Sequence, residues 1–171
     1  MQPLWRSIVT DFEVSAKPQG IWTKILDYVG PSRKLRLRAT GTWTWQEAAP
    51  APSGSPQPVT KPANAIDAVK AAASSAAVSI GHFGQCGPDG DIYVTAPADA
   101  LLADVLPGAL IGKIGGSSAA VKNSGAFVVG SDCVLEVDAN TKGPLYLTIN
   151  DSCVGMHDNS GTIRVSIWEA L

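Results

Sequence analysis

The sequence contains few of the residues and segments that mark specialised classes of protein. Of its 171 residues three are cysteine, and aromatic residues make up only 6%. Cys86, Cys133 and Cys153 cannot close a disulfide framework, and no two of them form a CxxC pair. No apolar run approaches the ~20 residues that span a bilayer, and the first ten residues, broken by Pro3 and Arg6, do not resemble a signal peptide. We therefore expect free thiols, no membrane span, and cytoplasmic synthesis, with release by a route without a signal peptide left open.

Charge and motifs exclude further classes. Charged residues make up 16% of the chain and the net charge is −2, which gives no general attraction to nucleic acid. The sequence has no P-loop, GxGxxG, HExxH or GxSxG motif. His82 and Cys86 are spaced H-x3-C and His157 adjoins Asp158, but these residues fall short of the usual zinc patterns. We expect a binding protein and not an enzyme.

Short alternating segments dominate wherever the hydrophobic period is readable. Lys34–Ala39 alternates Leu35, Leu37 and Ala39 with basic residues, and residues 145–150 and 162–167 alternate in the same way. Such segments are typical of antiparallel strands with one wet and one dry face. About eight short strands separated by Gly, Pro, Asn and Asp predict an all-β fold, an antiparallel β-sandwich of jelly-roll type. The weaker strand candidates are Ile8–Val14, Ile21–Ile25, Ala109–Ile114, Ala126–Val129 and Cys133–Val137.

Residues 47–85 interrupt this pattern. Glu47–Ala63 is rich in Pro, Ala and Ser, which predicts an extended loop. Ala65–Ala77 predicts the only helix, with Asn64 as its N-cap. Because alanine supplies helix propensity but little apolar bulk, we expect this helix on the surface of the sandwich. We treat residues 47–85 as an insertion into a single domain that spans residues 1–171.

The connection Asn150–Gly161, NDSCVGMHDNSG, lies between two strongly alternating segments and is longer than the two to five residues of an ordinary hairpin. It carries side-chain oxygens at Asp151, Asp158 and Asn159. Calcium binds six to eight oxygens from carboxylates, amides and loop carbonyls, so the segment is a candidate calcium loop. It is equally a candidate for an ordinary turn in which Asp158 and Asn159 cap their own backbone. Spacing alone does not decide between these alternatives.

Four motifs in a fixed order relate the chain to a known family. They are ATGTW at 39–43, GPDGD at 87–91, GALIGKIG at 108–115 followed by FVVG at 127–130, and LYLTIND with DNSG at 145–161. In this combination the chain resembles the PA-IL-like galactophilic lectins and a wider set of bacterial galactose-binding-like modules. The resemblance covers roughly residues 21–167 if 47–85 is an insertion, and it implies a lectin-like β-sandwich.

The resemblance also implies a site. In those lectins a calcium ion sits on the loop between the last two strands, and two hydroxyls of galactose complete its shell. By position, Asp151 matches an acidic ligand, and Asp158 and Asn159 match paired side-chain ligands. The carbonyls of Gly155, or a neighbour, and of Trp45 match the two main-chain ligands. That set supplies about five or six oxygens and leaves about two positions for water or sugar.

Two departures from the family qualify the expected ligand. Asp158 stands where the lectin has an amide, which retains or strengthens calcium binding. The lectin grips its sugar with a His and a Gln after the GPxGD motif, whereas Ile92–Ala98 contains neither. Trp45, His82 and Asp91 remain as candidates to contact a ligand. We therefore expect a sugar other than plain galactose.

Two functions from different classes follow. The first is a calcium-dependent carbohydrate-binding module whose partner is a carbohydrate or glycoconjugate. The alternative is a structural or protein-interaction subunit, in a homo-oligomer or larger assembly, that keeps the fold without a sugar site. The stripe formed by Lys34, Arg36 and Arg38 has two interpretations as well: a contact for phosphate or sulfated glycan, or a solvated strand face that resists aggregation.

Overall fold

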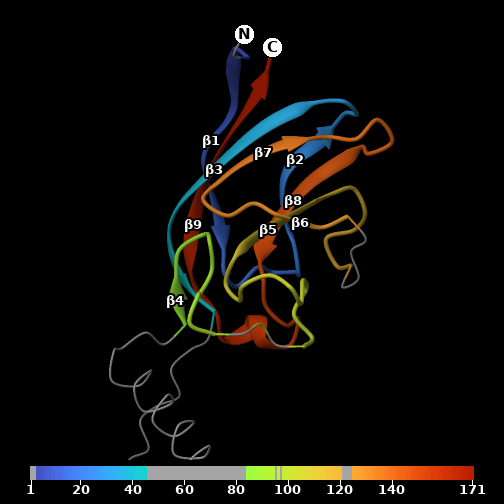
Figure 1. Ribbon diagram of the computed structural model, residues 1–171. Helices are drawn as coiled ribbons and strands as arrows, with labels where there is room; N and C mark the ends of the chain where they lie inside the picture. The colour runs from blue at the N-terminus through green and yellow to red at the C-terminus, as the bar shows by residue number, and fades with distance from the viewer. Residues whose placement is uncertain (1–2, 46–83, 95, 97, 121–124) are drawn as a thin grey trace, which may run out of the picture.

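Two antiparallel β-sheets packed face to face form the protein, as the computed structural model shows for residues 3–45, 84–94, 96, 98–120 and 125–171 (Figure 1). The predicted all-β antiparallel sandwich is confirmed. The five-stranded sheet contains β1 (Trp5–Ser15), β9 (Ser160–Ala170), β3 (Lys34–Thr44), β4 (Gln85–Cys86) and β7 (Asp132–Glu136). The four-stranded sheet runs in the order β2 (Thr23–Val29), β8 (Gly143–Ile149), β5 (Leu110–Ile114) and β6 (Phe127–Val128).

Every segment predicted as a strand overlaps an observed strand. The strand that the sequence does not reveal is β4, because its two residues are too few to show a period. β4 pairs with the end of β3, Trp43 opposite Cys86 and Thr44 opposite Gln85. The expected insertion, residues 47–85, thus overlaps β4 at residue 85.

β3 lies in the interior of its sheet. It pairs with β9 along its whole length, and its other edge pairs first with β7 and then with β4. An interior strand has no free edge to protect. The stripe of Lys34, Arg36 and Arg38 therefore protects no free edge, but its partly exposed side chains agree with the interpretation as a solvated strand face.

The core between the sheets consists of the inward residues of the alternating strands. Leu35 and Leu37 of β3 are at most 2% exposed, and the inward residues of β8 and β9 are fully buried. Full burial of such side chains stabilises the fold by about 1.5–3 kcal/mol each. Trp22 and Trp43 are buried and Trp5 and Trp168 half-buried, so no Trp of the described chain is fully exposed. The fully buried core residues of β8 and β9 are Leu145, Leu147, Ile149, Ile163, Val165 and Ile167.

The four-stranded sheet is covered on its outer face too. On β8, Tyr146 and Thr148 are buried, so the prediction of one wet face is wrong for this strand. Loops pack over them and form a second apolar cluster around Trp22, Ile111 and Tyr146. Lys113 of β5 is buried there, its Nζ 4.6 Å from the centre of the Trp22 ring and bonded to the Ser117 carbonyl at 2.6 Å. Burial lowers the pKa of this ammonium group.

The separated sequence motifs meet at the start of β5. Leu110 donates its N–H to the Pro88 carbonyl and accepts the N–H of Gly130, which joins GPDGD, GALIGKIG and FVVG. The carboxylate of Asp89 accepts the N–H of Ser131 at 2.7 Å. A side chain at Gly130 would bring Cβ within 2.6 Å of that carboxylate, and Gly130 has φ +59°. The motifs therefore form the framework that supports the loops at the end of the sandwich where β5 begins.

The expected Pro-rich loop and the helix Ala65–Ala77 lie outside the described residues. Among those described, no helix has the length and apolar character needed to cross a membrane.

Candidate functional site

The connection that carries the candidate ligands runs between the two sheets. β8 belongs to the four-stranded sheet and β9 to the five-stranded sheet, so Asn150–Asn159 crosses from one layer to the other. The two strands therefore do not form a hairpin, and alternation along two strands does not tell whether they are neighbours. A short 3₁₀ helix, Gly155–Asp158, forms part of the crossing at the end of the sandwich opposite the chain termini (Figure 1).

Asn150 anchors this connection to the loop before β5. Its side chain is fully buried. It accepts the N–H of Leu102 at 2.9 Å and donates to the carbonyls of Leu102, Val105 and Leu106. Its main chain bonds to Gly108 and Ala109. The sequence places Asn150 in the ND motif, but its anchoring role depends on contacts with residues more than 40 positions away.

Asp151 points its carboxylate into the connection. It is 3% exposed, its Oδ1 accepts the N–H of Ser152 at 2.6 Å, and its Oδ2 has no hydrogen-bond partner in the described chain. Burial raises the pKa of this carboxyl, and Asp158 and Asp99 raise it further. A buried oxygen without a partner carries a desolvation cost of about 1–3 kcal/mol. This oxygen therefore calls for a cation, a water or a proton.

Asp158 and Asn159 add further unpartnered atoms. Asp158 Oδ1 and both side-chain polar atoms of Asn159 are buried without a hydrogen bond in the described chain. The Asn159 amide is close enough to Asp151 to lower the pKa of that carboxyl, against the larger effect of burial, but its geometry is outside that of a hydrogen bond. The alternative in which Asp158 and Asn159 cap their own backbone finds no support in these atoms.

Gly155 leaves room above the Asp151 carboxylate. A Cβ at this position would lie 3.0 and 3.1 Å from the two carboxylate oxygens and 2.8 Å from Ser152 Oγ. A glycine there lets the main chain of the 3₁₀ helix pass close to the buried carboxylate. Asp151, Asp158 and Asn159 carry oxygen atoms of the kind that a hard cation prefers as ligands. The described chain contains no cluster of three or more His, Cys, Asp or Glu side chains that could hold a metal ion.

Trp45 and Asp91 are brought together beside this connection. The Trp45 indole donates Nε1–H to Asp91 Oδ2 at 3.3 Å, and Asp91 Oδ1 accepts the N–H of Tyr93 at 2.9 Å. Trp45 is 9% exposed and its ring packs against Gly108, whose N–H is bonded to the Asn150 carbonyl. Both oxygens of Asp91 and the face of the indole are therefore engaged within the fold. His82 lies outside the described residues.

Asp99 is a neighbour that sequence reasoning missed. It acts electrostatically on Asp151 and on Cys153, raising the pKa of each after the larger effect of burial. The adjoining Ala100 forms a β-bridge with Ser152, and Leu101 donates its N–H to the Asp151 carbonyl. No local pattern marks Asp99, because the pairing joins segments about 50 residues apart.

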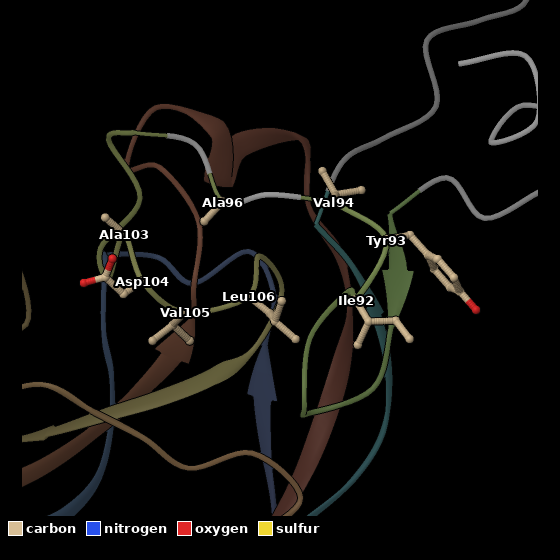
Figure 2. A pocket seen from close by; sticks show the side chains of 8 residues that line it. All are labelled: Ile92, Tyr93, Val94, Ala96, Ala103, Asp104, Val105 and Leu106. Atoms are coloured by element: carbon tan, nitrogen blue, oxygen red, sulfur yellow. The ribbon is translucent and has the colours of Figure 1, made fainter. Parts of the chain in front are cut away.

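A cavity of about 420 Å³ lies beside the site (Figure 2). One wall is the loop that Asn150 anchors, and the other is the segment where the resemblance would place the sugar-gripping His and Gln. Ile92 and Tyr93 are more than 70% exposed, and in Figure 2 the Tyr93 ring points away from the cavity. The lining residues are Ile92, Tyr93, Val94, Ala96, Ala103, Asp104, Val105 and Leu106.

Comparisons with known proteins support the fold. Searches against models of protein families and against curated proteins find no match. Among solved structures, the chain is similar to one described as "EclA N-terminal domain; PllA-like lectin". The TM-score is 0.54 and the identity 15%, over 94% of this chain and 96% of that one. The chain thus has a lectin-like fold.

Proposed function

We propose that this protein binds carbohydrate through a calcium ion held on the β8–β9 connection. One observation carries the proposal: Asp151, Asp158 and Asn159 bury unpartnered side-chain oxygens on a single ten-residue connection. Buried polar atoms are nearly always satisfied, so such a group indicates a missing ligand. The lectin-like fold, in a structure whose neighbour is described as a lectin, favours a sugar as the partner of that ion.

Asp151, Asp158 and Asn159 would hold the ion through side-chain oxygens, and Gly155 and Trp45 through carbonyls. Two carboxylates neutralise a divalent cation, and calcium accepts ligands of this kind at six to eight positions. The open positions of a bound calcium would take two neighbouring hydroxyls of a sugar ring. The protein's own part is to hold the oxygens apart from water and to leave one side of the ion open.

The sugar is expected to differ from plain galactose. The segment 92–98 supplies no His or Gln, and the Asp91 carboxylate is already bonded to Trp45 and Tyr93. Each missing hydrogen bond to a sugar costs on the order of 1 kcal/mol. Loss of two such bonds weakens binding about tenfold to a hundredfold. The adjoining cavity of about 420 Å³ suits a glycan larger than one galactose unit.

Calcium should raise the thermal midpoint of the full chain. A ligand that binds only the folded state stabilises it by about 2.7 kcal/mol at a hundredfold excess over Kd, which is a shift of roughly 5–10 °C for a domain of this size. Asp151→Ala should abolish the shift. Asp138→Ala, which removes an exposed carboxylate from the β7–β8 loop, should leave it unchanged. A wild-type midpoint that does not respond to millimolar calcium would overturn the proposal.

A second candidate function is a structural or protein-interaction subunit. The exposed Ile92 and Tyr93 beside the cavity favour it, since apolar side chains at a rim are typical of protein contacts. A glycan array probed with and without a chelator separates the two functions. Binding that disappears with the chelator supports the lectin; calcium binding with no glycan on the array supports the subunit.

A further inference from the structure

A cleft on the outer face of the five-stranded sheet joins two indoles and two guanidinium groups. It is about 270 Å³ in volume and is lined by Trp5, Trp168, Arg36 and Arg38. The strands that carry these residues are neighbours in the order β1, β9, β3 (Figure 1). Trp168 stands opposite Ser7 on one side and opposite Arg36 on the other. The residues therefore form a continuous platform across the sheet.

The polar side of the cleft is preorganised by Asp132. Arg36 donates Nε–H and Nη2–H to its two oxygens at 3.1 and 2.6 Å, and Arg38 donates Nε–H at 3.1 Å. Two cations share one carboxylate, so the cleft keeps a net charge of about +1. Asp132 is the one ion-pair partner of Arg38 in the described chain, and its bond uses Nε and not the terminal amino groups. The Arg38 side chain is 54% exposed.

The apolar side is supplied by the half-buried indoles of Trp5 and Trp168. A half-exposed indole presents a flat apolar face that stacks on the C–H face of a sugar ring. The guanidinium fork of Arg binds a carboxylate or sulfate in a planar, two-point arrangement. The volume is just below the usual range for drug-sized ligands, which suits one or two sugar units.

We propose that this cleft is a binding site for an acidic saccharide, a sugar unit bearing a carboxylate or sulfate. A nucleic acid is disfavoured because its phosphates would meet a single net positive charge on a chain of net charge −2. The site is separate from the β8–β9 connection, because Trp168 and Ser160 are eight residues apart on β9, about 27 Å along an extended strand. The proposal does not depend on calcium.

The test is a titration of the full chain with tetragalacturonate, followed by calorimetry and Trp fluorescence, with a chelator present throughout. The wild type should bind it, and its carboxyl-reduced counterpart at least tenfold more weakly. Arg38→Gln and Trp168→Ala should each weaken binding tenfold or more, with Trp5→Ala as a second aromatic variant if Trp168→Ala does not fold. Arg164→Gln is the matched control. It removes an exposed arginine from the outer face of β9, paired with Glu13, and should change nothing.

Five results would overturn the proposal. The cleft is not the site if tetragalacturonate fails to bind or if Arg38→Gln and Trp168→Ala leave its binding unchanged. Equal binding of the carboxyl-reduced tetrasaccharide removes the preference for acid. Inorganic sulfate binding as tightly as the saccharide reduces the cleft to a simple anion site. A sedimentation coefficient that falls in Trp168→Ala would show that this face is an interface between copies of the chain. Because the chelator excludes calcium, each result is independent of the function proposed for the β8–β9 connection.

Discussion

At the scale of single residues, two buried carboxylates near opposite ends of the sandwich differ in their hydrogen-bond partners and in the direction of their pKa shifts. Asp151 has an oxygen without a partner and a raised pKa caused chiefly by burial. Glu169, near the other end of β9, accepts hydrogen bonds from Arg6 at 2.7 Å and from Arg33. Its pKa is lowered, first by the bond to Arg6. The same side-chain chemistry therefore leaves an oxygen without a partner in one place and forms ion pairs in the other.

Glu169→Gln should reduce stability at neutral pH and not at low pH. A carboxyl whose folded pKa is lowered contributes stability above its ordinary value of 4.5, and that contribution is lost as the pH falls through the folded pKa. We expect a loss of about 1 kcal/mol at pH 7, because both arginines are more than half exposed. Urea unfolding from pH 7 down to about pH 3 measures it. A difference that grows toward low pH would contradict the assignment; Glu136→Gln, at an exposed pair, should have a smaller effect.

Gly155→Ala tests the proposed calcium loop at the glycine that lies against the Asp151 carboxylate. The added Cβ would lie about 3 Å from both Asp151 oxygens, against which the loop must shift. We expect the calcium-dependent rise of the thermal midpoint to fall by at least half, with the chain still folded in the chelator. Gly30→Ala, where φ is not positive and a Cβ meets nothing closer than 3.6 Å, is the control for the added methyl group. A full calcium response in Gly155→Ala would show that this glycine does not border the ion.

At the scale of elements, short pieces of structure depend on close packing at glycines. Gly108 has φ +75°, and a Cβ there would lie 2.3 Å from Cys86 Sγ and 3.0 Å from the Trp45 ring. β4 is only two residues long, so its place beside β3 depends on such side-chain contacts as well as on its ladder. Trp43, whose indole donates to the Gly108 carbonyl at 2.7 Å, belongs to the same contact.

Gly108→Ala should therefore destabilise the protein more than the backbone alone requires. We expect about 1 kcal/mol from the positive φ and a further 1–3 kcal/mol from overpacking against Cys86 and Trp45. Gly116→Ala is a matched control, since it has the same φ of +75° and nothing within 4 Å of the added Cβ. Denaturant unfolding of the two variants measures the difference. Equal losses in both would show that the packing around β4 has little energetic weight.

At the scale of the whole molecule, the two proposed sites lie toward opposite ends of one sandwich. They share β9, which begins beside the connection and carries Trp168 near its other end. Sites this far apart with no shared partners are usually energetically independent. Asp151→Ala should leave tetragalacturonate binding unchanged within about twofold, and Arg38→Gln should leave the calcium-dependent midpoint unchanged. Calorimetric titrations of both ligands against both variants would reveal any coupling.

The sequence by itself determined the class of fold and the chemistry of the candidate loop. Alternation along β3, β8 and β9 follows from the two-residue period of a strand, so it is readable without neighbours. The oxygens of Asp151, Asp158 and Asn159 lie within nine residues of one another and are likewise visible locally. Only the tertiary structure decided which strands are neighbours, that β8 and β9 belong to different sheets, and that β8 is covered on both faces. It alone brought Asp99 to Asp151 and Trp5 to Arg36, because contacts between distant segments depend on sheet order, which no local period encodes.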